Sequence, residues 1–231
     1  MKVTWLGHSS FCIESDEIKI VVDPFLSESP SKPENSDSII ENPDYVLITH
    51  GHPDHMGDSV QLLRESEATA VSGFEICNWL GSQGIPQERC LDMNIGGSLA
   101  INGATIHMVQ AVHSNSLLDK GSFVYAGYPA GFVIDINGES IYHTGDTGAF
   151  LDMKLIQELY SPAIGLIPIG DRFTMSPRTA AYACNNLLNL KTIIPMHYDT
   201  FPLLTGKPEE FKKQVSRGDV KILNPGETLE L

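Results

Sequence analysis

Short apolar runs separated by turn-forming residues recur along the chain and predict a protein rich in short strands. In the first half, these runs predict strands at residues 3–6, 11–14, 18–22 and 45–49, with a further strand near Ala70. The run at 45–49 is continuously apolar, which is typical of a strand buried on both faces. The pairs Asn102-Gly103 and Asn137-Gly138 each separate two apolar runs. They predict hairpins, because both residue types tolerate positive φ.

Segments of helical period alternate with strands in the rest of the chain. They predict helices at 58–66, 74–80, 154–159, 177–188 and 208–215, strands at 164–169 and 192–196, and a closing hairpin of 221–223 with 228–231. Residues 27–42, rich in Ser, Pro and Glu, predict a loop. The mixture indicates an α/β fold with mixed sheets. A length of 231 residues suits a single domain over 1–231, or two fused halves sharing a core.

The composition is that of a globular protein with an acidic surface. A formal net charge of -14 opposes binding to duplex nucleic acid or anionic membranes. The four cysteines, Cys12, Cys77, Cys90 and Cys184, form no CxxC pair and are expected to be reduced. The chain opens without a signal-peptide core, and no apolar run approaches membrane-spanning length. We therefore expect a cytoplasmic protein that acts on a small molecule, without a nucleic-acid or membrane partner, and homo-oligomers remain open.

The segment THGHPDHMGD at 49–58 carries the main chemical signal. Four metal-ligand types, His50, His52, Asp54 and His55, lie within six residues, directly after the predicted buried strand. Residues two apart in an extended chain point the same way, so His50 and His52 can bind one ion. Pro53 ends the strand, and the adjacent Asp54 and His55 can serve a second ion. Imidazole and carboxylate are ligands that zinc favours. The alternative, a solvated polar loop, rarely shows this spacing by chance.

Three further ligand candidates lie at the ends of predicted strands. His113 ends the run ATIHMVQAVH, Asp146 follows IYHTG, and His197 follows TIIPM. Each alone is typical of an ordinary polar residue at a strand end. Together they predict a site, because active sites of α/β proteins gather at the carboxyl ends of strands.

Seven segments spread over the chain resemble a known superfamily: WLGHSSF, VVDPF, THGHPDHMGD, AVHS, IYHTGDTG, PIGDRFTM and IPMHYDTFP. The third matches the H-x-H-x-D-H signature of the metallo-β-lactamase fold superfamily. The whole set resembles a prokaryotic family of metal-dependent hydrolases (UPF0173-like) and, more distantly, the ascorbate-phosphate lactonases and N-acyl-phosphatidylethanolamine phospholipases. The resemblance implies a four-layer αββα sandwich of two mixed β-sheets flanked by helices, with metals at one edge of the sheets.

The resemblance also implies a ligand set for two divalent ions. In that set His50, His52 and His113 hold the first ion, Asp54, His55 and His197 hold the second, and Asp146 bridges them. Zinc is the first expectation, with manganese or iron as alternatives. Such a pair lowers the pKa of bound water and polarises the scissile group. Two dications against two carboxylates leave a positive cluster, so we expect an anionic or strongly polar substrate.

The expected reaction is cleavage of an ester, lactone, amide or phosphodiester bond by a metal-bridging hydroxide. Asp58 falls where the helix at 58–66 begins, and an Asp at that position most often caps a helix. No separate general base is therefore expected, and Asp54 is predicted to act as both ligand and proton acceptor.

Several residues are expected to support the site. Asp23, before Pro24, is predicted to orient a metal-binding histidine, although a turn-initiating role is an alternative. His8 is a candidate for contact with substrate or a metal-bound group, or a structural histidine. Substrate contacts are also predicted for three residues that follow strand ends: Arg172, Thr174 and Tyr198. His143 is expected to be structural, and His107 to lie too far away. Residues 114–129 indicate a mobile flap over the pocket or an ordinary surface loop.

Three other functions remain as alternatives. A non-heme iron oxidoreductase or dioxygenase could use the same fold, since ligands of this mixture do not fix the metal. Nucleic-acid processing is disfavoured by the charge and by the lack of a basic stripe. A non-catalytic metal-binding protein would also need the full ligand set.

Overall fold

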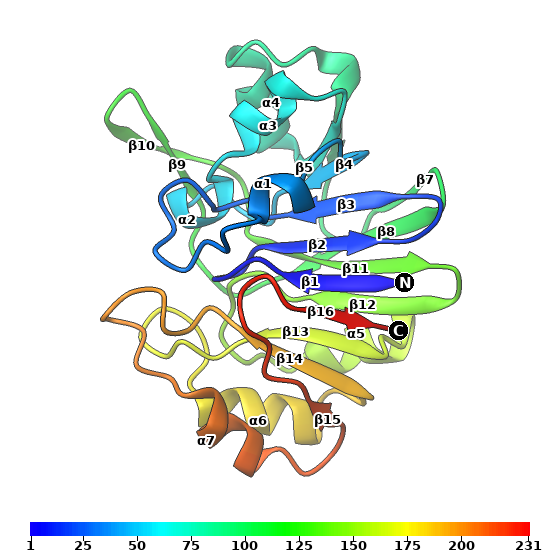
Figure 1. Cartoon of the computed structure of the whole chain (residues 1–231), viewed down its shortest axis with the longest axis vertical. Helices are drawn as coiled ribbons and strands as arrows, with labels where there is room; N and C mark the ends of the chain where they lie inside the picture. Colours follow the sequence, from blue (N-terminus) through cyan, green and yellow to red (C-terminus); the bar gives the residue numbers. More distant parts are fainter.

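The computed structural model describes residues 1–231 and contains two seven-stranded sheets that face each other (Figure 1). The first sheet has the order β16 (Thr228–Glu230), β1 (Lys2–Trp5), β2 (Phe11–Glu14), β3 (Lys19–Val22), β4 (Tyr45–Leu47), β5 (Thr69–Gly73) and β6 (Cys90–Met93). The second has the order β15 (Asp219–Val220), β14 (Thr192–Met196), β13 (Ile164–Pro168), β12 (Glu139–His143), β11 (Ala130–Ile136), β8 (Ala104–Gln110) and β7 (Ser98–Ile101). A separate hairpin joins β9 (Ser116–Asp119) to β10 (Ser122–Tyr125).

Alternation along the strands builds both faces of the first sheet. In β3, Ile20 and Val22 belong to the core between the sheets, whereas Val21 belongs to a small cluster on the other side. In and after β4, Leu47 enters the same central core, while Val46 and Ile48 join a cluster with residues of the covering helices. Both faces are buried because successive side chains of a strand point to opposite sides.

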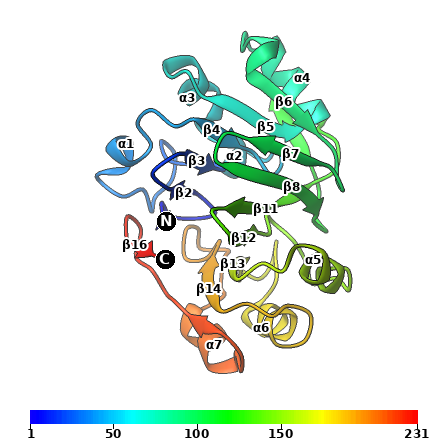
Figure 2. The same ribbon diagram turned by 90° about the vertical axis from the view of Figure 1, so that its right-hand side faces the viewer.

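Helices cover the outer face of each sheet and complete four layers (Figure 2). Short helices α1 (Ser36–Ile39) and α2 (Pro53–Met56) join α3 (Ser59–Glu65), α4 (Phe74–Ser82) and the 3-10 turn η1 (Gln87–Arg89) beside the first sheet. The second sheet is covered by α5 (Met153–Tyr160), α6 (Pro177–Asn186) and α7 (Pro208–Gln214). The αββα sandwich and all five predicted helices are thus confirmed, with helix ends shifted by one or two residues. No helix combines the length and apolar character that crossing a membrane requires.

Strand pairing brings several carboxyl ends to one edge. Parallel pairs join β3 to β6 through β4 and β5, and join β12 to β15 through β13 and β14. Parallel strands all end at the same edge of a sheet, and ligands bind there in α/β folds. Both predicted Asn-Gly hairpins are confirmed, as β7–β8 and β11–β12. At the second turn Asn137 and Gly138 have φ values of 52° and 85°, as this tight turn requires.

The predicted closing hairpin is wrong. Strand β15 pairs in parallel with β14, and β16 pairs with β1 in the other sheet. Without β15 and β16, β14 and β1 would be edge strands of their sheets. The two short strands separate because each one pairs with one of these edges. The loop at 27–42 contains the short helix α1, and the strand at 45–49 ends at Leu47. Residues 114–129, expected to be a flap or an ordinary loop, contain the β9–β10 hairpin.

The predicted helix cap at Asp58 is also wrong. Asp58 occupies the N-cap position of α3 but makes no side-chain bond to that helix. Its Oδ2 instead accepts hydrogen bonds from the backbone N–H groups of Leu26 and Ser27, at 2.7 and 2.9 Å. Its own backbone N–H donates to the carbonyl of Pro24 at 2.7 Å. Asp58 therefore ties the segment after β3 to the start of α3.

Replacing Asp58 with Ala should lower the free energy of unfolding by about 1–3 kcal/mol. The change leaves two backbone donors without their charged acceptor, and hydrogen bonds to charged groups contribute about this much. Urea denaturation of the two proteins measures the difference. Asp37→Ala is the control, because Asp37 is exposed and pairs only with Lys32 and Ser36. Surface changes of that kind cost about 0.5 kcal/mol or less. Equal losses in both variants would contradict the role of Asp58.

Candidate metal centre

The segment after β4 turns sharply, and the turn separates its four candidate ligands into two directions. His52 is in extended conformation and precedes Pro53, which occupies the first position of α2. Pro is favoured there, since its fixed φ suits the helix and its missing N–H would be unbonded anyway. His50 and His52 thus belong to the extended part, whereas Asp54 and His55 lie on the single turn of α2. The sequence expectation that the two pairs diverge agrees with this geometry.

Three histidines form the first group of converging ligand atoms. One ring nitrogen from each of His50, His52 and His113 lies within 4.8 Å of those of the others. Nε2 of His50 and Nδ1 of His52 are 3.0 Å apart. His113 follows β8 in the second sheet, and its ring centroid is 5.2 Å from that of His50. This group therefore joins the two sheets at one edge.

The second group contains Asp54, His55 and His197, together with His8. Oδ2 of Asp54 lies 3.8 Å from Nε2 of His197 and 3.0 Å from Nε2 of His8. His197 follows β14, and its backbone N–H donates to the carbonyl of His8 at 2.9 Å. The sequence predicts contact with substrate or a metal-bound group, or a structural role, for His8. The structure places its ring against Asp54 and His197.

Asp146 lies between the two groups. With His50 and His55 it forms a third set of ligand atoms within 4.8 Å of one another. Its Oδ1 is 3.3 Å from Nε2 of His55, and its Oδ2 is 3.0 Å from Nε2 of His197 and 3.6 Å from Nε2 of His113. A carboxylate in this position contacts residues of both groups, which is the arrangement that a bridging ligand requires.

Several of these atoms are buried without a hydrogen-bond partner. They are Nε2 of His55, Oδ1 of Asp146 and both ring nitrogens of His197. Buried polar groups in proteins are nearly always satisfied, and leaving one unpaired costs roughly 1–3 kcal/mol. Nε2 of His55 and Nε2 of His197 both lie close to the Asp146 carboxylate, so these atoms can direct lone pairs to a common point. Nδ1 of His197 lies beside Gly170 instead. The set of nitrogen and carboxylate donors therefore fits divalent cations.

The backbone is strained at three positions of this cluster. His8, Asp23 and His197 have φ values of 51°, 47° and 57°. The left-handed region costs about 1–2 kcal/mol for residues other than glycine, and such strain is typical of functional sites. Gly170 packs so closely on His197 that a Cβ would collide with the His197 carbonyl. Strained backbone and close packing together fix the direction of these rings.

Comparison with known proteins agrees with this geometry. The sequence model of the β-lactamase superfamily domain matches residues 2–197. A UPF0173 metal-dependent hydrolase of Methanopyrus kandleri is 44% identical over 234 residues, which cover 100% of both chains. The chain belongs to the β-lactamase superfamily and, within it, to the UPF0173 family of metal-dependent hydrolases. Membership identifies a metal-dependent hydrolase and specifies neither its substrate nor its metal.

Solved structures share the fold over the whole chain. Igni18, a metallo hydrolase from Ignicoccus hospitalis, is 35% identical with a TM-score of 0.88, and the match covers 100% of this chain and 98% of that one. CmlA, a diiron β-hydroxylase from Streptomyces venezuelae, is 16% identical with a TM-score of 0.75, over 100% of this chain and 54% of that one. The second likeness shows only the fold. A fold that also serves a hydroxylase does not by itself select the reaction.

Asp23 holds two residues of the metal-binding segment of this hydrolase, Thr49 and His55. Its Oδ1 accepts the backbone N–H of Thr49 at 2.8 Å, and its Oδ2 accepts the Thr49 hydroxyl at 2.7 Å. The same Oδ2 lies 2.7 Å from Nδ1 of His55, and both side chains are fully buried. Nδ1–H of His55 therefore donates to Asp23, which leaves Nε2 of His55 directed at the cluster. The contact is the one expected for a residue that orients a ligand.

Charge balance within the cluster shifts several pKa values. Burial lowers the pKa of His50 well below its usual range. Burial also opposes protonation of His55, but the carboxylates of Asp146 and Asp23 outweigh it and raise its pKa. Burial disfavours the charged form of Asp146, yet His197 and His55 hold its pKa well below the ordinary value. The Asp146 carboxylate is therefore ionised at neutral pH and can act as a ligand.

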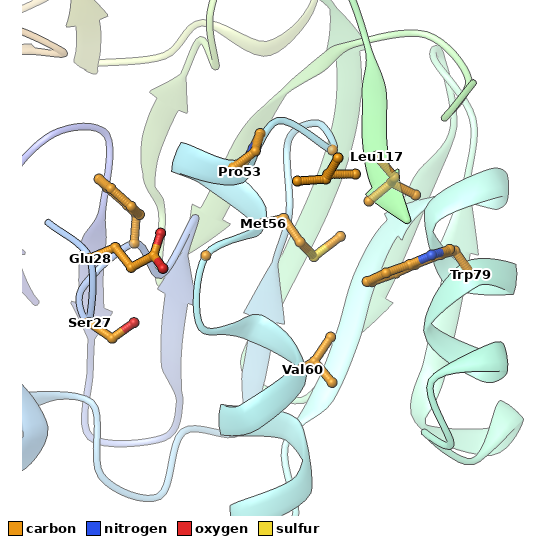
Figure 3. A pocket seen from close by; sticks show the side chains of 11 residues that line it. Ser27, Glu28, Pro53, Met56, Val60, Trp79 and Leu117 are labelled. Carbon is orange, nitrogen blue, oxygen red and sulfur yellow. The ribbon is translucent and has the colours of Figure 1, made fainter. Parts of the chain in front are cut away.

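The centre forms the floor of an open pocket of about 600 Å³. Its lining comprises His52, Pro53, Asp54, His113, Ser114, Ser116, Phe123, Asp146, Phe173 and His197. The opposite side of α2 faces a second cavity of about 290 Å³, where Met56 lies between Glu28 and Trp79 (Figure 3). Helix α2 thus presents Asp54 to the first pocket and Met56 to the second cavity.

The remaining predicted contacts lie at different distances from the pocket. Arg172 is exposed, and its guanidinium lies 5.5 Å from the ring centroid of Phe173, which lines the pocket. Oγ1 of Thr174 is buried without a hydrogen-bond partner. Tyr198 is outside the pocket lining and stacks on Trp5 at 5.2 Å, so its position indicates packing.

Two histidines excluded from the ligand set are held by other partners. His143 is buried and bonds the carbonyl of Ser9 at 2.9 Å. His107 bonds Ser98 and Asp135 on the second sheet. Sequence reasoning missed Thr200, whose hydroxyl lies 2.9 Å from Nδ1 of His8. Its place three residues after His197 is the only sequence signal for it.

Replacing Asp23 with Asn should weaken metal binding by about 10–100-fold, the range typical of residues that orient metal ligands. The Asp23 carboxylate accepts from the Thr49 backbone N–H, the Thr49 hydroxyl and Nδ1–H of His55. The Asn amide has only one acceptor oxygen for these three donors, and it no longer fixes the tautomer of His55. Competition with a chromogenic chelator measures the affinity.

The matched control for Asp23→Asn is Asp135→Asn. Oδ2 of Asp135 also contacts a histidine, His107, at 2.9 Å, but far from the centre. This variant should leave metal affinity unchanged within about twofold. Equal weakening by the two variants would rule out a specific role for Asp23.

Proposed function

We propose that this chain is a hydrolase with two divalent ions that cleaves an ester, lactone, amide or phosphodiester bond of a small anionic substrate. The observation that carries the proposal is the sharing of Asp146 between two groups of converging ligand atoms on the floor of one open pocket. A purely structural metal site is closed by protein ligands, whereas a catalytic one leaves room for substrate.

The proposed division of ligands follows the geometry. His50, His52 and His113 would hold one ion, and Asp54, His55 and His197 the other, with Asp146 between them. Zinc is our first choice, because nitrogen and carboxylate donors at a buried site suit it, and manganese or iron fit the same donors. Two such ions would lower the pKa of water and polarise the bond to be cleaved.

The proposed substrate class rests on the size and charge of the pocket. A volume of about 600 Å³ lies within the usual range for small-molecule sites. Two dications would exceed the charge of the Asp54 and Asp146 carboxylates, so the floor would be positive and favour an anionic or strongly polar group. The Arg172 guanidinium adds a positive charge beside Phe173, which lines the pocket. The net charge of -14 disfavours nucleic acid as the substrate.

In our proposal Asp54 carries a negative charge and His8 is neutral. Burial opposes ionisation of Asp54, but the His8 hydrogen bond and the charge of His55 hold its pKa well below the usual range. Burial and the neighbouring His197 lower the pKa of His8 to about 4, so it is neutral at neutral pH. His8 therefore positions the Asp54 carboxylate, and Thr200 fixes the other nitrogen of the His8 ring at 2.9 Å. Asp54 remains the ligand and the proposed proton acceptor.

The setting we propose is the cytoplasm. All four cysteines are free and buried, which suits a reducing compartment. Burial raises the pKa of Cys12, Cys77 and Cys184 to about 12, so these thiols are unreactive.

Protein purified without chelator should contain two ions per chain by elemental analysis. Asp146→Asn should lower the affinity for both ions, since Asp146 contacts both groups. His113→Ala should affect mainly one ion. Removal of the ions should lower the melting temperature, because ligands that bind only the folded form stabilise it. A reproducible content well below one ion per chain after reconstitution, or loss of a single ion in Asp146→Asn, would contradict the shared carboxylate.

The function is tested by turnover of lactones, esters, amides and phosphodiesters with zinc-, manganese- or iron-loaded protein. Loaded protein that turns over none of them would support a non-catalytic metal protein. Oxygen consumption by the iron form alone would support an oxidoreductase.

On an accepted substrate, His8→Gln should retain kcat within about threefold, since the Gln amide can still donate to Asp54. His8→Ala should lose about tenfold or more and bind metal more weakly. His8 is neutral across pH 6–9 and adds no titration of its own in this range. Wild type, His8→Gln and His8→Ala should therefore all show a kcat/KM that rises with pH, as water at the ions loses its proton, and then levels off. If Gln and Ala both lose about a hundredfold with metals retained, in the range of general-base catalysis, His8 transfers the proton itself.

A further inference from the structure

The β9–β10 hairpin is fixed to the metal-binding segment at its base. Oδ1 of Asn115 accepts the backbone N–H of Gly51 at 2.7 Å, and its Nδ2 donates to the carbonyl of Ala126 at 2.6 Å. Leu117 is buried and packs so close to Gly51 that a Cβ on Gly51 would lie 2.8 Å from Leu117 Cγ. A two-stranded hairpin is marginal on its own. Here its orientation relative to the centre is set by these contacts.

One face of the hairpin is apolar and exposed. Strand pairing places Ser116 opposite Tyr125 and Leu118 opposite Phe123, and cross-strand partners share a face. Leu118, Phe123 and Tyr125 are 49%, 70% and 69% exposed. Large apolar side chains gathered on one exposed surface mark a site of interaction more often than chance.

This face borders the metal pocket. Ser116 and Phe123 line the same pocket as the candidate ligands, and Phe173 lines it from the loop after β13. Phe173 is 50% exposed. The pocket therefore has a polar floor of histidines and carboxylates and an aromatic wall formed by side chains from two separate segments. Small-molecule sites commonly combine apolar walls with a few polar groups that fix orientation.

We propose that Phe123 and Phe173 determine specificity by holding an aromatic or other flat apolar group of the substrate, while its polar group lies at the metal centre. The inference rests on the proposed function and adds an apolar part to the expected anionic substrate. Continuity with the metal pocket favours the substrate over a second copy of the chain as the occupant of this face. The net charge of -14 on each chain opposes self-association as well.

The test compares two probes with the same metal-binding head, acetohydroxamate and phenylacetohydroxamate. Isothermal titration calorimetry measures their Kd values on zinc-loaded wild type, Phe123→Ala, Phe173→Ala and the control Tyr182→Ala. Tyr182 is a suitable control because it is 57% exposed on α6, outside the pocket lining. Size-exclusion chromatography with light scattering gives the mass of each protein.

Wild type should bind the phenyl probe about tenfold more tightly than acetohydroxamate. Each Phe→Ala change should reduce this preference about three- to tenfold, the size expected for one aromatic contact. The Kd of acetohydroxamate should stay within about twofold, and Tyr182→Ala should change neither value. Because the replaced side chains are exposed, the variants should unfold at the wild-type temperature.

Three results would overturn the inference, and they differ in what they say of the function. If acetohydroxamate binds but neither Phe change alters the preference, the aromatic wall has no such role and the proposed function stands. If neither probe binds the loaded protein, the proposed metal centre fails and the inference fails with it. If wild type is an oligomer that Phe123→Ala dissociates, the apolar face belongs to a contact between copies.

Discussion

The buried carboxylate of Asp23 is the interaction on which the rest of the centre depends. It follows β3, and it binds the backbone and hydroxyl of Thr49 after β4 as well as Nδ1 of His55 on α2. One side chain thus sets the spacing of two strand ends and the direction of a metal-facing ring. A buried carboxylate is costly unless it is paired and hydrogen-bonded. The three donors make the left-handed backbone of Asp23 tolerable, and they exist only when β3, β4 and α2 are all in place.

The sequence predicted the parts of the site that are local. The spacing of His50, His52, Asp54 and His55 predicts that their side chains converge, because two of them share an extended segment and Pro53 starts a helix. The strand ends predict that His113, Asp146 and His197 meet at one edge. Strands β8 and β12 both run antiparallel to β11, and β12, β13 and β14 run parallel, so β8, β12 and β14 finish at the same edge. The contacts of His8 with Asp54 and Thr200 link residues 46 and 192 positions apart, and no local pattern encodes such pairs.

The wrong predictions about the fold also involve contacts between residues far apart in the sequence. The segments at 221–223 and 228–231 resemble a hairpin locally, but two open sheet edges compete for them and divide them. For residues 114–129 the sequence predicts a mobile flap or an ordinary surface loop, whereas the contacts of Asn115 and Leu117 with Gly51 anchor the β9–β10 hairpin. The sequence position of Asp58 predicts a helix cap, whereas its acceptor oxygen faces a segment more than thirty residues earlier.

The centre also connects the two halves of the sandwich. His50, His52, Asp54 and His55 come from the first sheet and its following helix, whereas His113, Asp146 and His197 follow strands of the second. Two further contacts join the sheets at the same edge. The backbone N–H of His197 donates to the His8 carbonyl, and His143 bonds the carbonyl of Ser9. Ions bound here would cross-link the sheets and satisfy Nε2 of His55, Oδ1 of Asp146 and Nε2 of His197. Part of the metal-binding free energy would then stabilise the fold, so a substitution that loosens the sheet contact should weaken metal binding without touching a ligand.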